Sequence, residues 1–195
     1  MISDLTELYV RLSGGFWSLR TRMLSCRNKP VQRLYMHLYY LYQKSYGAYI
    51  GHSADINGIP CFPHNLHGIF IAGGARLGKN CVIFQNVTIG ANPMPFSSTT
   101  GFPTIGNNCY IGAGAVIVGN INIGNNCRIG ANCTVFSDVP DNAIVVADKP
   151  RVIEKDTPLI NKYYRWSPLG PLYFDDGQWI RETDQSIIDN LKNKL

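Results

Sequence analysis

Apolar residues recur every six positions through the middle of this chain, with one interruption. An α-helical stripe does not keep a period of six, and a simple strand repeats every two residues. A short fixed period of this kind is typical of a solenoid in which each hexad supplies a strand and a turn. The positions are Ile71, Leu77, Ile83, Ile89, Ile105, Ile111, Ile117, Ile123, Ile129 and Val135. They predict a triangular β-helix with three hexads in each coil.

The same spacing extends back to Ile50, with one insertion on the way. Positions 62 and 71 are nine residues apart instead of six, so three extra residues form a corner bulge within CFPHNLHGIF, residues 61–70. The expected coils are 50/56/62, 71/77/83, 89/105/111 and 117/123/129, with a partial turn at 135.

A second insertion lies between Ile89 and Ile105, which are sixteen residues apart. Its extra residues fall in a polar, proline-containing stretch, residues 91–104, which we expect to protrude from a corner as a loop. Loops on a rigid scaffold often carry binding residues. The aromatic residues Phe96 and Phe102 make this loop the element that we expect to face a bound substrate.

Four of the six cysteines share one register position, four residues after a repeat residue. Elsewhere this position takes Ala, Val or Ile, so we expect small side chains that point into the prism, where a free thiol behaves as a small hydrophobe. These cysteines are Cys81, Cys109, Cys127 and Cys133. We expect reduced core residues in a reducing compartment and no disulfide framework.

The residues on either side of the repeat have different patterns. The first 48 residues show helical periodicity, and a second helix is expected to begin at Pro30. The apolar face of the first helix consists of Leu5, Leu8, Tyr9 and Leu12. After residue 149 the hexads end, and the aromatic, turn-rich stretch WSPLGPLYFDDGQW follows. The sequence thus predicts an N-terminal helical segment (1–48), a β-helix domain (49–149) and a C-terminal extension (150–195).

The net charge of +5 is concentrated in residues 1–48, which contain seven Lys and Arg residues and two acids. A basic, aromatic helical segment can rest on an anionic membrane surface, pack on a partner subunit or form a solvated face. No nucleic-acid-binding motif accompanies the charge, so we expect no nucleic-acid partner. The N-terminus has acids where a signal peptide has bases. We expect a cytoplasmic protein, with peripheral association at the inner membrane face as the alternative.

Cys61, His64 and His67 are evenly spaced in the corner bulge. Zinc accepts all three ligand types, but the spacing matches no established zinc site, so we expect no metal. A neutral imidazole is a good general base near neutral pH. The residues alone leave open a catalytic base, a metal ligand set and ordinary corner residues.

The chain resembles the left-handed β-helix acyltransferases, or hexapeptide-repeat acyltransferases, over about residues 50–153. The resemblance rests on the hexads, the corner His64, and the motifs FQNVTIG and IGAGAVIVGN…IGNNCRIGAN. Within that family the chain is most similar to the serine acetyltransferase branch, which includes many sugar O-acetyltransferases. The resemblance implies a mainly β fold, a left-handed parallel β-helix with an N-terminal α-helical segment and a C-terminal extension.

Members of this family are typically homotrimers that bind acetyl-CoA in a groove between two prisms. The resemblance implies that His64 is the general base, which removes the proton of an acceptor hydroxyl as its oxygen attacks the acetyl thioester. It also implies contacts to the cofactor from the backbone near Ala113 and Ala131. Lys149 and Arg151 are expected to bind the CoA phosphates because of their charge.

Several positions depart from the serine acetyltransferase pattern. Pro63 stands where those enzymes have an acid before the catalytic histidine, Tyr49 where they have the acid that orients it, and Phe102 where they have a second histidine. Asp55 is the alternative orienting acid. If the coils stack in register, Gln85 and Asn86 should face the region between His64 and the loop. The expected substrate-binding residues are His67, Gln85, Asn86 and Phe102.

These observations lead to the hypothesis of an acetyl-CoA-dependent O-acetyltransferase that acetylates a sugar hydroxyl in surface-polysaccharide biosynthesis. The three departures around the amino-acid pocket favour a glycan or another small-molecule acceptor over serine. A serine O-acetyltransferase with an altered acceptor pocket is the first alternative. A catalytically silent trimeric scaffold is the second, from a different functional class.

Overall fold

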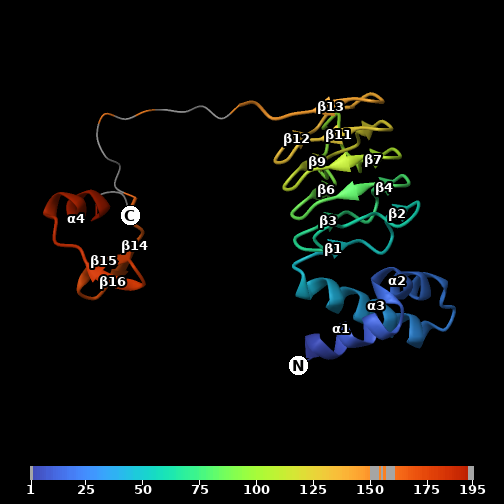
Figure 1. Cartoon of the computed structure of the whole chain (residues 1–195), viewed down its shortest axis with the longest axis horizontal. Helices are drawn as coiled ribbons and strands as arrows, with labels where there is room; N and C mark the ends of the chain where they lie inside the picture. The colour runs from blue at the N-terminus through green and yellow to red at the C-terminus, as the bar shows by residue number, and fades with distance from the viewer. Residues whose placement is uncertain (1, 150–153, 155, 157–160, 193–195) are drawn as a thin grey trace. The chain divides into compact units, whose positions relative to one another are not determined.

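A computed structural model describes residues 2–149, 154, 156 and 161–192, with the backbone alone for residues 2–4. The chain divides into two compact units, Met1–Lys149 and Pro150–Leu195 (Figure 1). The first unit holds three helices and strands β1 to β13, and the second holds strands β14 to β16 and a fourth helix. No helix in these described ranges has the length and hydropathy needed to cross a bilayer.

Thirteen short strands form the three parallel sheets of a prism in the first unit (Figure 1). Sheet A contains β1 (Tyr49–Ile50), β3 (Phe70–Ile71), β6 (Thr88–Gly90), β9 (Val116–Val118) and β12 (Thr134–Val135). Sheet B contains β2 (Asp55–Ile56), β4 (Arg76–Leu77), β7 (Thr104–Ile105) and β10 (Asn122–Ile123). Sheet C contains β5 (Val82–Ile83), β8 (Tyr110–Ile111), β11 (Arg128–Ile129) and β13 (Ile144–Val145).

The repeat residues of successive coils pair directly with one another. Positions 50, 71, 89, 117 and 135 pair in order along sheet A, positions 56, 77, 105 and 123 along sheet B, and positions 83, 111, 129 and 145 along sheet C. This is the register that the hexads predict, and Val145, beyond the predicted repeat, continues sheet C. The expected fold class, a mainly β left-handed parallel β-helix with N-terminal helices, is therefore confirmed.

Two residues of each hexad fill the interior of the prism. The repeat aliphatic is one of them, and the residue four positions later is the other. The second set consists of Ala75, Cys81, Val87, Cys109, Ala115, Ile121, Cys127, Cys133 and Val139, none more than 8% exposed. All six cysteines are free thiols, and the four in this set are core residues, as the sequence predicts.

Asparagines with left-handed backbone angles build the corner between sheets B and C. Asn80, Asn108, Asn126 and Asn142 have φ angles of 57, 56, 58 and 60°, a conformation that Asn tolerates better than most residues. The side-chain amide nitrogens of the first three donate to the Oδ1 of the asparagine in the next coil, at 3.2, 3.1 and 3.0 Å. This ladder fixes the edge of sheet C and the outward side chains beside it.

Backbones of successive coils approach so closely at this corner that glycine is required. A Cβ added to Gly106 would lie 2.7 Å from the carbonyl oxygen of Gly124 and 2.9 Å from the backbone nitrogen of Asn125. At Gly90 the nearest atoms to an added Cβ are side-chain methyl carbons at 3.5 and 3.7 Å, which is ordinary contact. The distance between coils therefore excludes a side chain at position 106 but allows one at position 90.

Three helices precede the β-helix: α1 (Ile2–Leu12), α2 (Gly15–Ser25) and α3 (Lys29–Ser45). Helices α2 and α3 pack on the first coil, and α1 packs on α2 and α3. The side chain of Asn28 caps α3 by accepting a hydrogen bond from the Val31 backbone N–H at 3.3 Å. The buried Tyr39 links this helix to the prism, because its hydroxyl donates to the Ile50 carbonyl oxygen at 3.0 Å. The helical core is thus continuous with the prism core.

The predicted apolar face of the first helix lies on the surface of this unit. Its residues Leu5, Leu8, Tyr9 and Leu12 are 64, 52, 38 and 79% exposed. Among the α1 side chains that the structure describes, residues 5–12, Thr6 and Val10 are buried. The helix therefore buries Val10 on one side and exposes the longer apolar stripe of Leu5, Leu8, Tyr9 and Leu12 on the other.

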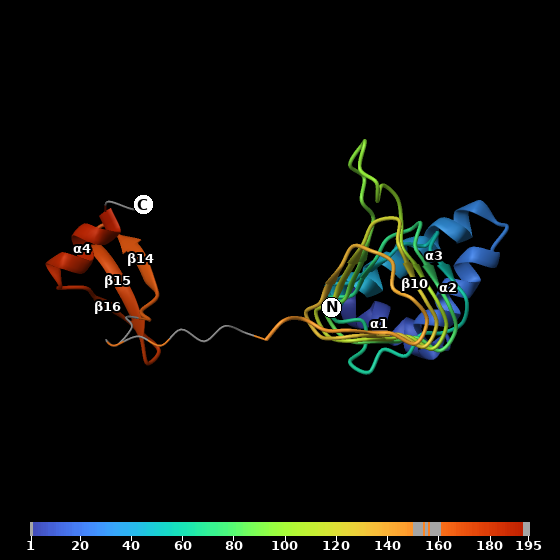
Figure 2. The ribbon, with the colours of Figure 1, turned by 90° about the horizontal axis from the view of Figure 1, so that it is seen from above.

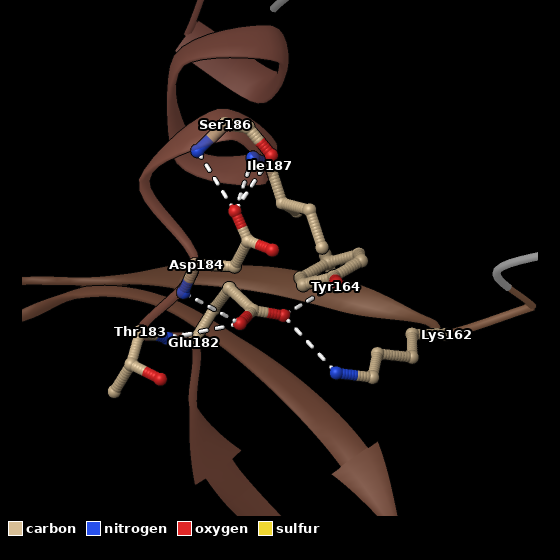
Figure 3. Close-up of polar contacts among 7 residues, drawn as sticks. All are labelled: Lys162, Tyr164, Glu182, Thr183, Asp184, Ser186 and Ile187. Carbon is tan, nitrogen blue, oxygen red and sulfur yellow. Dashed lines mark hydrogen bonds and ion pairs between the residues drawn. The ribbon is translucent and has the colours of Figure 1, made fainter.

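The second unit is a three-stranded antiparallel sheet with one helix. Its elements are β14 (Tyr164–Ser167), β15 (Gly170–Asp175), β16 (Gln178–Arg181) and α4 (Gln185–Lys192). Glu182, 5% exposed, connects the strands to the helix (Figure 3). Its carboxylate accepts hydrogen bonds from the Tyr164 hydroxyl (2.7 Å), the Lys162 ammonium (3.2 Å) and the backbone N–H groups of Thr183 (2.9 Å) and Asp184 (3.0 Å).

We expect Gly106→Ala to lower the unfolding temperature of the β-helix, because inter-coil hydrogen bonds on both sides hold the clashing backbone in place. Overpacking of this kind costs about 1–3 kcal/mol. Gly90→Ala adds a methyl group at ordinary contact distance and is the matched control, with melting expected close to that of the wild type. Equal melting of the two variants by circular dichroism would show that inter-coil distance does not constrain Gly106.

We also expect the second unit to lose stability in acid. The hydrogen bonds that the Glu182 carboxylate accepts lower its pKa to about 2, and the bond from the Asp184 backbone N–H has the largest effect. A glutamate in an unfolded chain has a pKa of about 4.3. The carboxylate therefore stabilises the folded unit above the unfolded pKa, and this stabilisation is lost as the pH falls toward the folded pKa.

Amide protection factors in residues 161–192, corrected for the intrinsic exchange rate at each pH, measure this loss. Glu182→Gln should show weaker protection at neutral pH and a flatter acid dependence. Wild-type protection that stays constant as the pH falls from the unfolded pKa of glutamate to the folded one would contradict the role of the carboxylate.

Candidate functional site

The three-residue insertion forms the corner at which the first coil passes from sheet C to sheet A. Residues 63–68 are a turn, closed by a hydrogen bond of 3.0 Å from the Ile69 N–H to the Leu66 carbonyl oxygen. Leu66 and Ile69 are buried and anchor the turn in the core. His64 and His67 consequently project from it as exposed side chains.

Four coils bring distant parts of the sequence to this one corner, which we call the His64 corner (residues 64–68, 85–86, 113–114 and 131–132). Backbone hydrogen bonds connect its levels: Asn86 N–H to His67 O (3.0 Å), Gly114 N–H to Gln85 O (3.0 Å) and Asn132 N–H to Ala113 O (2.9 Å). One column therefore contains the predicted base, the predicted acceptor contacts of the first two coils and the predicted pantetheine contacts. They are His64, His67, Gln85, Asn86, Ala113 and Ala131.

Aromatic packing positions the His64 imidazole. Its ring centre lies 5.7 Å from that of Phe84, and the Phe84 ring lies 5.0 Å from that of Tyr110 in the next coil. No ion pair of His64 with a carboxylate occurs within the part of the chain that the structure describes. The ring is therefore held by its neighbours and remains open to solvent.

The alternative orienting acid is placed away from this corner. Asp55 lies in β2 of sheet B and pairs with Arg76 of β4, whereas His64 lies between sheets C and A. The expectation that Asp55 orients His64 is wrong within one chain, because the sheets are different faces of the prism. Tyr49, at the position of the family's acid, lies between Tyr40 and Phe70 in an aromatic stack, with ring centres 5.7 and 5.2 Å away.

Cys61, His64 and His67 do not converge despite their even spacing. Cys61 pairs with Val82 in the ladder of sheet C. The His67 ring packs edge-on against Tyr46, with centres 5.0 Å apart. No group of three or more His, Cys, Asp or Glu side chains able to hold a metal ion occurs among the described residues. The spacing therefore reflects the corner insertion.

Gln85 and Asn86 share the corner but differ in environment. Asn86 has φ of 59°, and its amide oxygen occupies the space that a Cβ on Gly68 would need. Asn132 has the same relation to Gly114, so Asn86 is explained as a turn residue of the coil. The Oε1 of Gln85 is buried without a hydrogen-bond partner in the described residues. Such an acceptor costs about 1–3 kcal/mol.

The loop at residues 91–104 leaves the prism at another corner. It joins β6 of sheet A to β7 of sheet B and projects from the prism (Figure 2). Phe102 covers Gly74, where an added Cβ would lie 2.5 to 2.6 Å from its ring atoms. The expectation that Gln85 and Asn86 lie between His64 and the loop is therefore wrong within one chain, because each corner joins a different pair of sheets.

The two basic residues expected to bind phosphates follow the last coil. Lys149 is exposed and lies four residues beyond the end of β13. Arg151 lies outside the described residues. The strand β13 belongs to sheet C, from which each earlier coil turns toward the His64 corner.

Sequence reasoning missed Phe84 and Tyr110, whose rings continue from His64 across sheet C. A signal was present, because each residue flanks a repeat isoleucine, Ile83 or Ile111. Neighbours in a strand point to opposite faces, so a large ring beside a buried isoleucine must lie on the outer surface. Such rings stand out among the polar and small residues that usually flank the repeat.

Three comparisons with known proteins agree on the family of the repeat. The bacterial transferase hexapeptide family (six repeats) matches residues 102–137. A serine acetyltransferase of Synechococcus elongatus is 44% identical over 86 residues, 44% of this chain and 34% of that protein. The crystal structure of Entamoeba histolytica serine acetyltransferase isoform 3 with cysteine has a TM-score of 0.57 and 30% identity, over 72% of this chain and 50% of that chain. Neisseria gonorrhoeae serine acetyltransferase in complex with serine has a TM-score of 0.56 and 29% identity, over 74% and 56%.

These relatives overturn the expectation of a sugar acceptor and of a role in surface-polysaccharide biosynthesis. The similar proteins are serine acetyltransferases by sequence and by structure. They support the alternative, a serine acetyltransferase with an altered acceptor pocket, over the sugar hypothesis. The chain spans between 34 and 56% of the length of these relatives. Its β-helix carries the hexapeptide repeat of the bacterial transferases and is similar, in sequence and in structure, to serine acetyltransferases.

Proposed function

We propose that the chain is an acetyl-CoA-dependent serine O-acetyltransferase with an altered acceptor pocket. The observation that carries this proposal is the His64 corner, where coil stacking collects residues from four hexads into one column. The base, the unpaired Gln85 acceptor and the backbone of the Ala113 and Ala131 turns all lie there. The serine acetyltransferases that the chain resembles support the same reaction class.

In this proposal His64 acts as the general base. An alcohol is a poor nucleophile until its proton is removed, and a neutral imidazole suits that step near neutral pH. A ring nitrogen of His64 takes the hydroxyl proton of serine as the oxygen bonds to the carbonyl carbon of the acetyl thioester. As the C–S bond breaks, the imidazolium gives the proton to the thiolate of CoA. O-acetylserine and CoA leave, and His64 is neutral again.

The corner also fits the donor. Acetyl-CoA supplies an activated acetyl group on a pantetheine arm, which contains two amides. In the proposal this arm lies along the Ala113 and Ala131 turns. The unpaired Oε1 of Gln85 accepts a hydrogen bond from an amide N–H of the arm or from the ammonium of serine. Such a bond would relieve the cost of the buried acceptor.

The acceptor pocket requires a second copy of the chain. Phe102 and the loop lie at the corner between sheets A and B, away from His64. We therefore propose a homotrimer in which the loop of a neighbouring copy closes the His64 corner. Phe102 then contributes an apolar wall where the resemblance leads us to expect a histidine. Pro63 stands where the serine acetyltransferases have an acid, and no other acid takes its place in the proposed pocket. The pocket is altered in its acceptor-binding groups while the base is retained.

The location of the protein in the cell stays a prediction. A cytoplasmic location follows from the proposed reaction with acetyl-CoA. Peripheral association with the inner membrane face would use the basic helical segment, in which Leu8 and Leu12 also expose apolar surface. Binding to vesicles with anionic lipids, compared with neutral vesicles, distinguishes this association from a solvated basic face.

We expect His64→Ala to lower the rate of CoA release from acetyl-CoA with L-serine by about 10²–10⁴-fold, the usual contribution of a general base. His37→Ala is the matched control, because His37 is exposed on α3. The wild-type reaction should also require the acceptor hydroxyl, so L-alanine should give only background hydrolysis.

Two results would contradict this proposal. Unchanged turnover in His64→Ala would remove the assigned base. Equal CoA release with L-serine and L-alanine would mean that the chain hydrolyses the thioester or is a scaffold with contaminating activity. The thermal melt of each variant separates a catalytic effect from loss of folding.

A further inference from the structure

One face of the three-stranded sheet in the second unit combines cations with aromatic rings. Residues that pair directly across β14, β15 and β16 point to the same face. One such row, which we call the arginine row, consists of Arg165, Leu172 and Arg181. The next row on this face, which we call the aromatic row, consists of Tyr163, Phe174 and Trp179. The ring centres of Phe174 and Tyr163 lie 5.4 and 6.0 Å from that of Trp179, so the aromatic row is one cluster.

The opposite face of this sheet carries contacts within the unit. Neighbours in a strand point to opposite faces, so Tyr164 lies on that side, where it borders α4 beside Ile187 and Leu191. Glu182 accepts hydrogen bonds there from the Tyr164 hydroxyl and the Lys162 ammonium (Figure 3). The cation Lys162 is thus already paired with a carboxylate of the same unit.

The cations of the arginine row have no such partner. Arg165 and Arg181 are exposed, and neither guanidinium forms an ion pair or a hydrogen bond with another residue that the structure describes. No Asp or Glu belongs to either row. The Tyr163 and Phe174 side chains beside them are 72 and 48% exposed. This face therefore offers unpaired positive charge next to accessible apolar surface.

Stacking on Trp179 orients the Arg165 guanidinium. The central guanidinium carbon lies 3.8 Å from the centre of the Trp179 ring. Because Arg165 is on β14 and Trp179 is on β16, the arginine side chain crosses β15 to reach the ring. Its charge is thereby brought to the strand that also carries Arg181, two residues after Trp179. A stacked guanidinium keeps the N–H groups at its edge free to donate, and a bound carboxylate would offset the repulsion between the two cations.

The charge of the whole unit favours one class of anionic partner. Residues 161–192 contain four Lys and Arg residues and five Asp and Glu residues, which gives a net charge of −1. Nucleic acids and anionic membranes are bound through many cations on one surface, so the charge of this unit disfavours both. Two arginines beside apolar rings fit a short segment with a few carboxylates and apolar side chains. In an extended peptide, residues two positions apart lie on one side and about 7 Å from each other.

We propose that this face of the second unit binds an extended acidic peptide segment of a partner protein. Two carboxylates on one side of the segment bind Arg165 and Arg181, and apolar side chains of the segment pack on Tyr163 and Phe174. The inference is independent of the proposed acetyl transfer, because it uses residues of the second unit alone.

Binding of a labelled peptide to the full-length chain tests this inference. Fluorescence anisotropy should show saturable binding of a short fluorescein-labelled peptide of alternating Glu and Leu, and the affinity should fall as the salt concentration rises. Arg165→Gln and Arg181→Gln should each weaken binding about tenfold or more, the usual effect of losing a charged hydrogen bond. Lys192→Gln removes one exposed cation from the last turn of α4. It is the matched control and should bind the peptide as the wild type does.

A second measurement needs no substitution in the protein. On titration of the wild type with the same peptide, NMR signals of the arginine and aromatic rows, including the Trp179 indole N–H, should shift, and those of α4 should not. A peptide with Gln in place of Glu should bind at least tenfold more weakly. Equal affinity of the arginine variants and the wild type, equal binding of the Gln peptide, or a wild type that binds no acidic peptide would overturn the inference. Tighter binding of oligothymidylate or of anionic vesicles through the same arginines would also overturn it.

Discussion

The inter-coil ladder is the interaction on which the rest of this structure depends. Backbone N–H groups of each coil donate to carbonyl oxygens of the adjacent coils, so residues of successive hexads lie directly over one another. The coils approach so closely that side chains are excluded at Gly106, and the corner asparagines adopt left-handed angles to turn the chain. Backbone groups inside such a stack must be paired. A shift of one coil would break its hydrogen bonds and turn its apolar residues outward.

Because the coils stack in register, residues that are far apart in the sequence come together in one site. Residues that are 18 to 28 positions apart return to the same corner in the next coil, because the insertions are accommodated as loops or bulges. The levels of the His64 corner are therefore held at the spacing of β-strands, about 4.8 Å, and a long, narrow molecule fits such a column. The same constraint carries the aromatic path from His64 to Tyr110. Positioning of this kind lowers the entropic cost of bringing reactants together.

The repeat predicted the coils and the buried cysteines, because the period determines which residues stack, whereas Ala113 and Ala131 were assigned to the site from the family resemblance. It did not determine contacts that depend on side-chain direction. Phe102 was assigned to the site from the family resemblance and Asp55 as a substitute for the missing orienting acid, and both lie at other faces or corners of the prism within one chain. The aromatic support of His64 by Phe84 was missed, because the sequence shows that the Phe84 ring faces outward but does not show which side chain it meets in the structure. The acceptor was misjudged because losses at Pro63, Tyr49 and Phe102 outweighed the features shared with serine acetyltransferases.

The central claim is that the reacting atoms meet at the corner between sheets C and A. A crystal structure of the protein with CoA and L-serine tests it most directly. The account predicts the CoA sulfur and the serine hydroxyl next to the His64 ring, with the pantetheine arm along the Ala113 and Ala131 turns of the same prism. Electron density for CoA at the corner of the loop or along sheet B, with His64 free of ligand, would contradict it.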